Sequence, residues 1–154
     1  MPENVEVLFN QDVLKVNGVR YHHHPNGGGL IAETAQVAPT AYVGPFARVL
    51  DRAVVLDRAS LIGVTTVEGD ACVMDDACVR DCVIGGHAII FSHAHVGYHS
   101  FIGGRALIGG TVHLCASSVA GSVTVAGSII VRTAVLNSGR YDDDHPPPDP
   151  PSSV

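Results

Sequence analysis

The chain of 154 residues contains no tryptophan and a single lysine (Lys15), and only 5% of its residues are aromatic and 16% charged. Helical proteins are normally rich in lysine, glutamate and leucine, so this composition argues against a helix bundle. No apolar run reaches the length of about 18 residues that a membrane-spanning helix needs. A net charge of −6 provides no basic surface for nucleic acid. We therefore expect neither a membrane nor a nucleic acid as a partner.

Secretion by a recognisable signal is not expected either, because the first residues lack the basic and apolar segments of a signal peptide. The four cysteines are Cys72, Cys78, Cys82 and Cys115. In a chain without a secretion signal they are expected to be buried or free thiols rather than a disulfide framework. The expected location is the virion if a phage encodes the chain, and otherwise the cytoplasm.

Small and aliphatic residues recur with a period of six, the aliphatic residue following the small one by two positions. Nine aliphatic residues keep this step without a slip: Ile31, Val37, Val43, Val49, Val55, Leu61, Val67, Val73 and Val79. After one dropped residue the series resumes with Ile84, Ile90, Val96, Ile102, Ile108 and Leu114. After a second dropped residue it ends with Val119, Val125 and Val131. A helical core stripe repeats every 3.6 residues, so this period does not indicate a helix.

A six-residue period predicts a short strand followed by a corner. The small and the aliphatic residue are two apart and therefore point to the same side of an extended segment. The remaining positions hold turn-forming residues, as in Asp51-Arg52 and Gly103-Gly104. Three strands and three corners close a triangular coil of about eighteen residues, so the repeats predict about six stacked coils. The expected prism is about 25–30 Å tall.

The repeat resembles that of the hexapeptide-repeat superfamily, and Val43-Gly44-Pro45-Phe46-Ala47-Arg48 fits the family pattern at each position. The resemblance covers residues 29–135 and implies a left-handed parallel β-helix, with the handedness taken from the family. The glycine-rich entry at residues 26–29, followed by A-x-V repeats, is similar to a subset of these proteins common in bacterial and phage genomes. The predicted fold class is all-β.

Two arms flank the predicted solenoid of residues 29–136. Residues 1–28 are expected to form an arm built on a β-hairpin, because Asn17-Gly18 is a strong turn signal between two apolar runs. Residues 137–154 contain five of the nine prolines and four aspartates, so they are expected to form a flexible, acidic tail.

An apolar stripe is predicted on one outer face of the prism. The positions beside each core aliphatic residue point outward, and every third repeat shares a face. One face then collects Val54, Leu56, Cys72, Met74, Ile89, Phe91 and Leu107. A contiguous patch of this kind usually marks an interface, although single apolar residues are ordinary on any surface. Proteins of the resembled family are typically parallel trimers, so we expect a homotrimer built through this face.

An acyltransferase is one alternative that the resemblance raises. The segment around His95 and His99 is similar to that of sugar and nucleotide-sugar acyltransferases, whose catalytic histidine precedes the next core isoleucine by four positions. Tyr98 occupies that position here, and His99 lies one residue late and is followed by Ser100. The histidine candidates for a general base are His95, His99 and His113.

A zinc enzyme resembling the γ-class carbonic anhydrases is a further alternative. That class uses two histidines five residues apart, a spacing that the repeats of this chain lack. The candidate metal ligands are instead Cys78, His95 and His113, which stack on one face at intervals of one coil. The same spacing also fits a histidine and cysteine ladder packed against a neighbouring subunit, and we favour that interpretation. No cofactor is expected.

The sequence thus favours a non-catalytic, trimeric structural protein. The phage resemblance suggests a decoration or cement protein on a capsid lattice. The N-terminal arm is the expected docking element, because it has apolar residues outside the repeat: Val7, Phe9, Leu14 and Tyr21. A hairpin is only marginally stable alone, so the arm could also cap the first coil.

Overall fold

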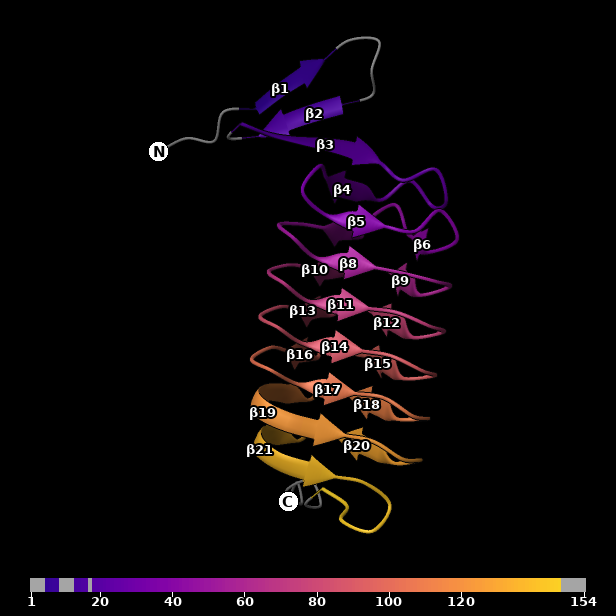
Figure 1. Cartoon of the computed structure of the whole chain (residues 1–154), viewed down its shortest axis with the longest axis vertical. Coiled ribbons are helices and arrows are strands. Elements are labelled where there is room, and N and C mark those ends of the chain that lie inside the picture. Colours follow the sequence, from indigo (N-terminus) through magenta and orange to yellow (C-terminus); the bar gives the residue numbers. More distant parts are fainter. Residues whose placement is uncertain (1–4, 9–12, 17, 148–154) are drawn as a thin grey trace.

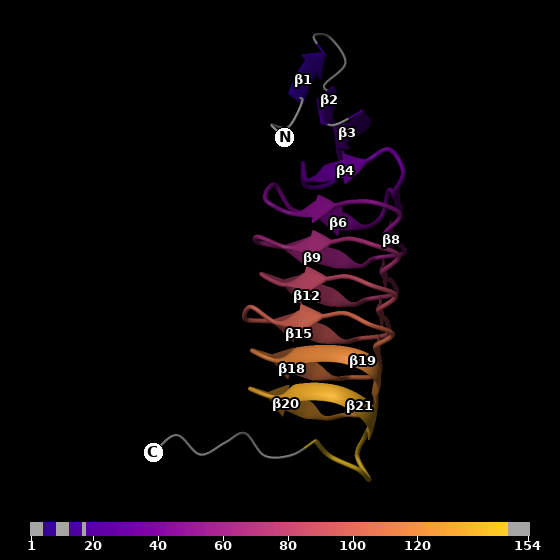
Figure 2. The same ribbon diagram turned by 90° about the vertical axis from the view of Figure 1, so that its left-hand side faces the viewer.

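Each six-residue repeat folds into one short strand and one corner, and three repeats make one coil. The computed structural model describes residues 5–8, 13–16 and 18–147, and within them it is an all-β, parallel solenoid of about six turns (Figure 1). Figure 2 shows the coils stacked along one axis, with β1, β2 and β3 at one end. The predicted fold class is confirmed.

Three flat faces, each a ladder of parallel strands, enclose the interior. Face 1 consists of β4 (Leu30–Ala32), β7 (Arg48–Val49), β10 (Thr66–Val67), β13 (Val83–Ile84) and β16 (Phe101–Ile102). Face 2 consists of β5 (Gln36–Val37), β8 (Val54–Val55), β11 (Cys72–Val73), β14 (Ile89–Ile90) and β17 (Leu107–Ile108). Face 3 consists of β6 (Tyr42–Val43), β9 (Ser60–Ile62), β12 (Cys78–Arg80), β15 (His95–Gly97), β18 (His113–Cys115) and β20 (Ile130–Arg132).

The last coils join faces 1 and 2. Strand β19 (Ser118–Val125) pairs with β16 at its start and with β17 at its end, so it runs along both faces. Strand β21 (Val135–Tyr141) follows β19 in parallel with a register shift. We call the corner between faces 1 and 2 corner 1, that between faces 2 and 3 corner 2, and that between faces 3 and 1 corner 3.

The repeat register predicted from the sequence is the register of the core. The aliphatic column from Val43 to Val79 is fully buried, and so are Ile84, Ile90, Ile102, Ile108 and Leu114 after the first dropped residue. Their small partners fill the narrow space beside each corner; Ala53 and Ala71, for example, are 0% exposed. A larger side chain at these positions would have no room between the converging walls.

From the second coil onward, the corners depend on residues with a left-handed backbone. The residue two positions after the core aliphatic has a positive φ, as at Asp51 (φ 56°), Asp57 (57°) and Asp75 (60°). Aspartate tolerates this conformation better than most residues, and glycine does so without strain. Gly104 (φ 63°) has a second reason to lack a side chain, because a Cβ there would collide with the backbone nitrogen of Gly121 in the next coil.

The repeat is one residue short at two places along the chain, and both places lie at corner 3, so the turn is shorter there. The turns there close through side chains that bond back to the chain: the Cys82 thiol and the Ser117 hydroxyl donate to the carbonyls of Arg80 and Cys115. Between these short turns lies a longer one in which Tyr98 and His99 both have positive φ (57° and 61°). Corner 3 therefore has an uneven profile, with Tyr98 72% exposed.

The N-terminal arm forms an antiparallel meander that continues onto the solenoid. Strand β1 (Val5–Leu8) pairs with β2 (Val13–Val16), and β2 pairs with β3 (Val19–His23). The sequence predicts a hairpin within residues 5–21 with its turn at Asn17-Gly18, and Asn17 lies outside the described residues. In addition, β3 pairs antiparallel with β4, which covers the first strand of face 1.

The first strand of face 3 is capped by the loop that follows β3. The His24 side chain is 5% exposed and its Nε2 lies 2.9 Å from the carbonyl oxygen of Ala41. The Asn26 amide donates to the same carbonyl at 3.0 Å. The Val43 N–H donates to the Asn26 carbonyl, so the edge of β6 is occupied by this loop. At the other end β21 runs four residues beyond Asn137, the expected start of the tail.

The burial of Val55 at 0% exposure provides a test of the register. Replacing Val55 with Asp places an unpaired carboxylate between the three faces, and we expect it to lower the free energy of unfolding by at least about 3 kcal/mol. Val135→Asp is the matched control, because Val135 is a strand valine that is 69% exposed. Chemical denaturation of the two variants makes the comparison, and equal stability would contradict the register.

Candidate functional sites on the faces and corners

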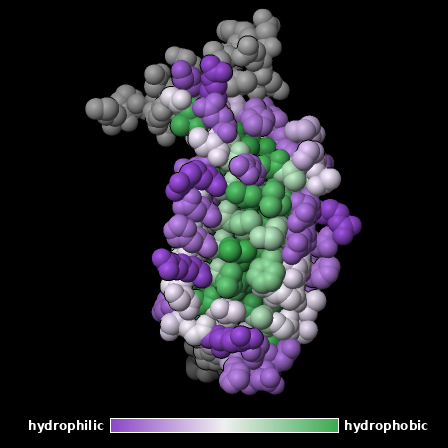
Figure 3. Space-filling model, in the orientation of Figure 1, coloured by the Kyte–Doolittle hydropathy of each residue, from purple (hydrophilic) through white to green (hydrophobic). Residues whose placement is uncertain are grey.

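The predicted apolar stripe lies on face 2. Val54, Cys72, Ile89 and Leu107 are direct neighbours in successive parallel strands. Leu56, Met74 and Phe91 follow the same strands one position beyond the core residue, and Leu56 (36%) and Leu107 (39%) are the most exposed of the seven. Figure 3 shows this stripe as a continuous band along the solenoid axis. The sequence therefore placed all seven residues on one surface.

A glycine keeps face 2 flat. A Cβ on Gly109 would collide with the ring of Phe91, so the ring occupies the space above the next coil. A large aromatic side chain can lie along the sheet here instead of projecting from it. The result is a broad apolar surface without a protruding residue at its centre, which suits packing against another flat sheet.

Two identical columns of charged residues border face 2, and sequence analysis did not find them. At corner 1 the guanidinium of Arg52 pairs with Asp70 at 3.0 Å, and His87 Nδ1 lies 3.7 Å from the same carboxylate. At corner 2 Arg58 pairs with Asp76 at 3.0 Å, and His93 Nδ1 lies 3.8 Å from it. Opposite charges one coil apart in the sequence were the signal that could have revealed these columns.

Aspartates at the same corners also hold successive coils together. The Asp51 carboxylate accepts the N–H of Gly69 at 2.9 Å, and the Asp75 carboxylate accepts that of Ser92 at 2.9 Å. The hollow of about 620 Å³ at corner 2 is lined by such residues, among them Asp57 and Asp75. Their carboxylates are already engaged in the corner hydrogen bonds, so this acidic cluster has a structural role.

The described cysteines are free, and burial keeps three of them in the thiol form. Burial raises the pKa of Cys72, and the nearby Asp57 and Asp75 raise it further. Burial likewise raises the pKa of Cys78, although the positive charge of Arg80 lowers it in part. Burial also raises the pKa of Cys82. The thiolate is the nucleophile and the metal ligand, so these thiols are weak candidates for either role at neutral pH.

Face 3 brings His95 and His113 together. They are paired residues of β15 and β18, and their rings stack with centroids 4.8 Å apart and an angle of 6° between the planes. Cys78 is the pairing partner of His95 on the other side, as the spacing predicts. All three line the same hollow, which also contains Cys115.

The stacked arrangement does not favour a metal site within one chain. The lone pair of an imidazole nitrogen lies in the ring plane, so nitrogens of two parallel rings direct their lone pairs side by side rather than toward one point. Within the described residues no group of three or more His, Cys, Asp or Glu is arranged to hold a metal ion. The raised pKa of Cys78 also disfavours its thiolate as a ligand.

His99 does not join the other two candidate bases. It lies at corner 3 in a separate hollow of about 460 Å³ lined by Val64, Val83 and Phe101, while His95 and His113 lie on face 3. His87, His93 and His99 occupy three different corners of one coil, as their spacing predicts. The residues considered for general base catalysis are thus divided between two places.

Of the four docking candidates, only Tyr21 can be placed with its side chain. Tyr21 lies on β3 opposite Ala32 and is half-buried. Val7 and Leu14 are pairing partners in β1 and β2, and the structure describes only the backbone of these two residues. Phe9 lies outside the described residues.

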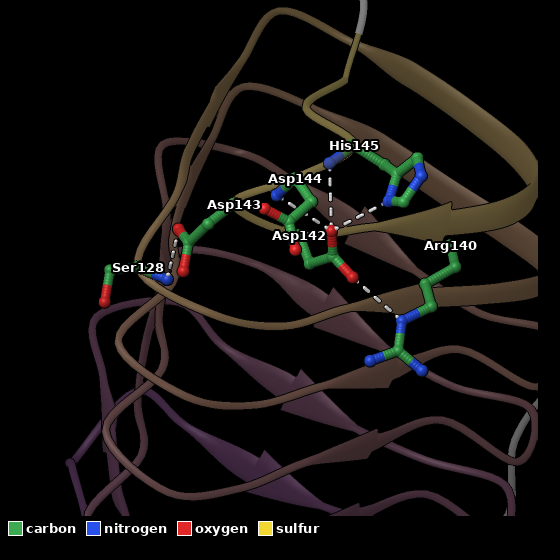
Figure 4. Close-up of polar contacts among 6 residues, drawn as sticks. All are labelled: Ser128, Arg140, Asp142, Asp143, Asp144 and His145. Carbon is green, nitrogen blue, oxygen red and sulfur yellow. Dashed lines mark hydrogen bonds and ion pairs between the residues drawn. The ribbon is translucent and has the colours of Figure 1, made fainter.

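The segment after β21 forms a compact turn around Asp142 (Figure 4). The Asp142 carboxylate accepts hydrogen bonds from Arg140 Nε and the His145 N–H at 2.9 Å, and from the Asp144 N–H at 3.1 Å. The neighbouring Asp143 accepts the N–H of Ser128, which ties the turn to corner 2 of the preceding coil. The first part of the expected tail is therefore tied to the last coil of the solenoid.

No protein-family model, curated protein or solved structure matches the chain. In the part of the chain that the structure describes, no helix has the length and apolar character needed to cross a membrane. The functional proposal therefore rests on the surfaces described above and on the resemblance of the repeats.

The Asp142 turn predicts a distinct titration. The hydrogen bond from Arg140 is the largest cause that lowers the pKa of Asp142 to about 2 from its usual 3.8, and His145 lowers it further. The contribution of this carboxylate is complete above pH 3.8 and is lost as the pH falls through about 2. Carbon-13 NMR titration should show this midpoint, and Arg140→Gln should raise it. A wild-type midpoint near 3.8 would contradict the turn.

Proposed function

We propose that the protein is a non-catalytic structural protein that assembles into a parallel homotrimer through face 2. The observation that carries the proposal is the apolar stripe over four successive coils with a charged column along each edge. An apolar centre surrounded by polar residues is the usual anatomy of a protein interface. A contiguous apolar patch of this kind usually marks an interaction site.

A trimer in which each copy turns face 2 toward a common axis suits this geometry. Three flat apolar sheets would then enclose a second core, parallel to the interior of each solenoid. Corner 1 of one copy would meet corner 2 of the next, and the two columns have the same order of charges, Arg52-Asp70 and Arg58-Asp76. Because corner 2 follows corner 1 by a third of a coil, Arg58 of one copy would lie at a height between Arg52 and Asp70 of the next. Exposed ion pairs contribute little stability, but they favour one register.

Membership of the hexapeptide-repeat superfamily, with its left-handed coil, belongs to the same proposal. It is supported by the six-residue period and by the parallel solenoid of about six turns. The trimer is the common assembly of that superfamily. Tyr98 occupies the position of the family's catalytic histidine, and His99 lies one residue late and is followed by Ser100, which favours a structural role over an acyltransferase.

We further propose that the trimer decorates a larger assembly such as a phage capsid and docks through residues 1–28. Support comes from the similarity of the glycine-rich entry and repeats to proteins common in phage genomes. The meander of β1, β2 and β3 also extends past the first coil, at one end of the prism (Figure 1). Its outermost strand β1 ends the sheet order, so a partner strand could pair with it.

The native molecular mass of the protein tests the proposed homotrimer. Sedimentation equilibrium should give three chains for the native protein, and Met74→Glu combined with Phe91→Glu should give monomers or aggregate. The control combines Tyr98→Glu with Phe101→Glu, two aromatic residues that are more exposed and lie at corner 3 and on face 1. The control should retain three chains. A native mass of one chain, or equal behaviour of both double variants, would refute the proposal.

Capping and docking can be separated by two deletions of the arm. Removing residues 1–16 leaves β3 paired with β4, so we expect a soluble trimer that no longer binds its assembly. Removing residues 1–23 opens the edge of β4, and an open edge promotes association of sheets. We therefore expect only the longer deletion to aggregate in light scattering. Aggregation of both would show that β1 and β2 are themselves part of the cap.

A further inference from the structure

We propose that face 3 carries a binding site for a small phosphomonoester in the hollow above Gly97, a function separate from the proposed assembly. The hollow has a volume of about 240 Å³ and is lined by Arg80, His95, His113 and Tyr98, among others. It lies over β12, β15 and β18, on the face that the proposed trimer leaves open to solvent.

The hollow exists because one side chain is missing from a column. Arg80, Gly97 and Cys115 occupy the same outward position in successive strands. At Gly97 a Cβ would meet only the Arg80 carbonyl oxygen, at 3.8 Å, so the space above this residue is open. Its φ is not in the left-handed region, so the backbone does not require glycine here. The absence of a side chain therefore creates room without serving a turn.

The charges around this space favour an anion, although the chain as a whole has a net charge of −6. The outward positions of the six strands of face 3 contain no aspartate or glutamate, but they include Arg80, Arg132 and the stacked histidines. Within the described residues the ion pair of Arg80 is a long one, with its Nε 3.9 Å from the Asp81 carboxylate. The guanidinium thus retains donors for a ligand.

The donors match the oxygens of a phosphate group. The rings of His95 and His113 lie in nearly parallel planes with their centroids 4.8 Å apart, a separation that two oxygens of one oxyanion can bridge. The planar guanidinium of Arg80 binds phosphate with two parallel hydrogen bonds.

The remaining wall suggests an ester rather than the free ion. A phosphate ion fills only part of the volume, and Ile62 and Tyr98 supply apolar surface beside the charged donors. Tyr98 is held outward by two consecutive residues of positive φ, Tyr98 and His99. A small carbon group attached to the phosphate can pack against this wall.

NMR titration of the histidine ring protons at constant ionic strength tests the site, with inorganic phosphate and phenyl phosphate as probes. We expect saturable shifts at His95 and His113, with tighter binding of phenyl phosphate. Arg80→Gln or His95→Gln removes a charge-assisted hydrogen bond and should weaken binding about tenfold or more. Arg48→Gln on face 1 and His22→Gln on β3 are matched controls away from the hollow and should change the affinity less than about twofold.

A third variant separates a shaped site from general attraction to basic residues. Gly97→Leu fills the hollow and leaves each charge in place, so we expect it to abolish phenyl phosphate binding. Undiminished binding in Gly97→Leu, equal losses in the control variants, or unsaturable shifts in the native protein would each overturn the proposal. The readout is the same for a monomer and a trimer, so the result is independent of the proposed assembly.

Discussion

The coil length of 17 or 18 residues, which falls to 16 where β21 pairs with the end of β19, is the constraint on which the rest of the structure depends. Burial of one aliphatic and one small side chain per repeat fixes where each strand lies, since a slip of one residue would turn the aliphatic residue outward. Val55, for example, pairs with Val73 one coil later, and both are fully buried. Apolar burial is the dominant favourable contribution to folding, so the core determines the register of the whole solenoid.

The same constraint organises the outer surface into columns. Any residue type that recurs at the coil length is repeated at the spacing of adjacent strands, about 4.8 Å. Apolar residues recur in this way on face 2, arginine and aspartate at corners 1 and 2, and histidine on face 3. Each column gains a property that its single members lack: a continuous apolar band, alternating charge, or a pair of stacked rings. Assembly and binding are the functions that such repeated surfaces serve best.

The sequence was sufficient for the features that depend on spacing alone. It predicted the core from Val43 to Leu114, the apolar stripe on face 2 and the pairing of His95 with His113. The cap formed by His24 could not be foreseen, because it depends on a long-range hydrogen bond to Ala41. The same is true of the turn around Asp142.

Side-chain orientation explains the remaining differences. The spacing of His95 and His113 is compatible with metal ligation, but the parallel stack of their rings is not. Arg52 and Asp70 are 18 positions apart, so aligning the corner positions of successive coils would have predicted their ion pair. Predicting the hollow above Gly97 would have required knowing how far the side chains of Arg80 and Tyr98 extend, and the repeat period does not give that information.

The most direct test of the central claim is whether face 2 is covered in the native protein. Hydroxyl-radical footprinting should show Met74 and Phe91 protected at high protein concentration and increasingly modified on dilution, while Tyr98 at corner 3 is modified at every concentration. Modification of Met74 that does not change with protein concentration and follows its exposure in a single chain would contradict the account.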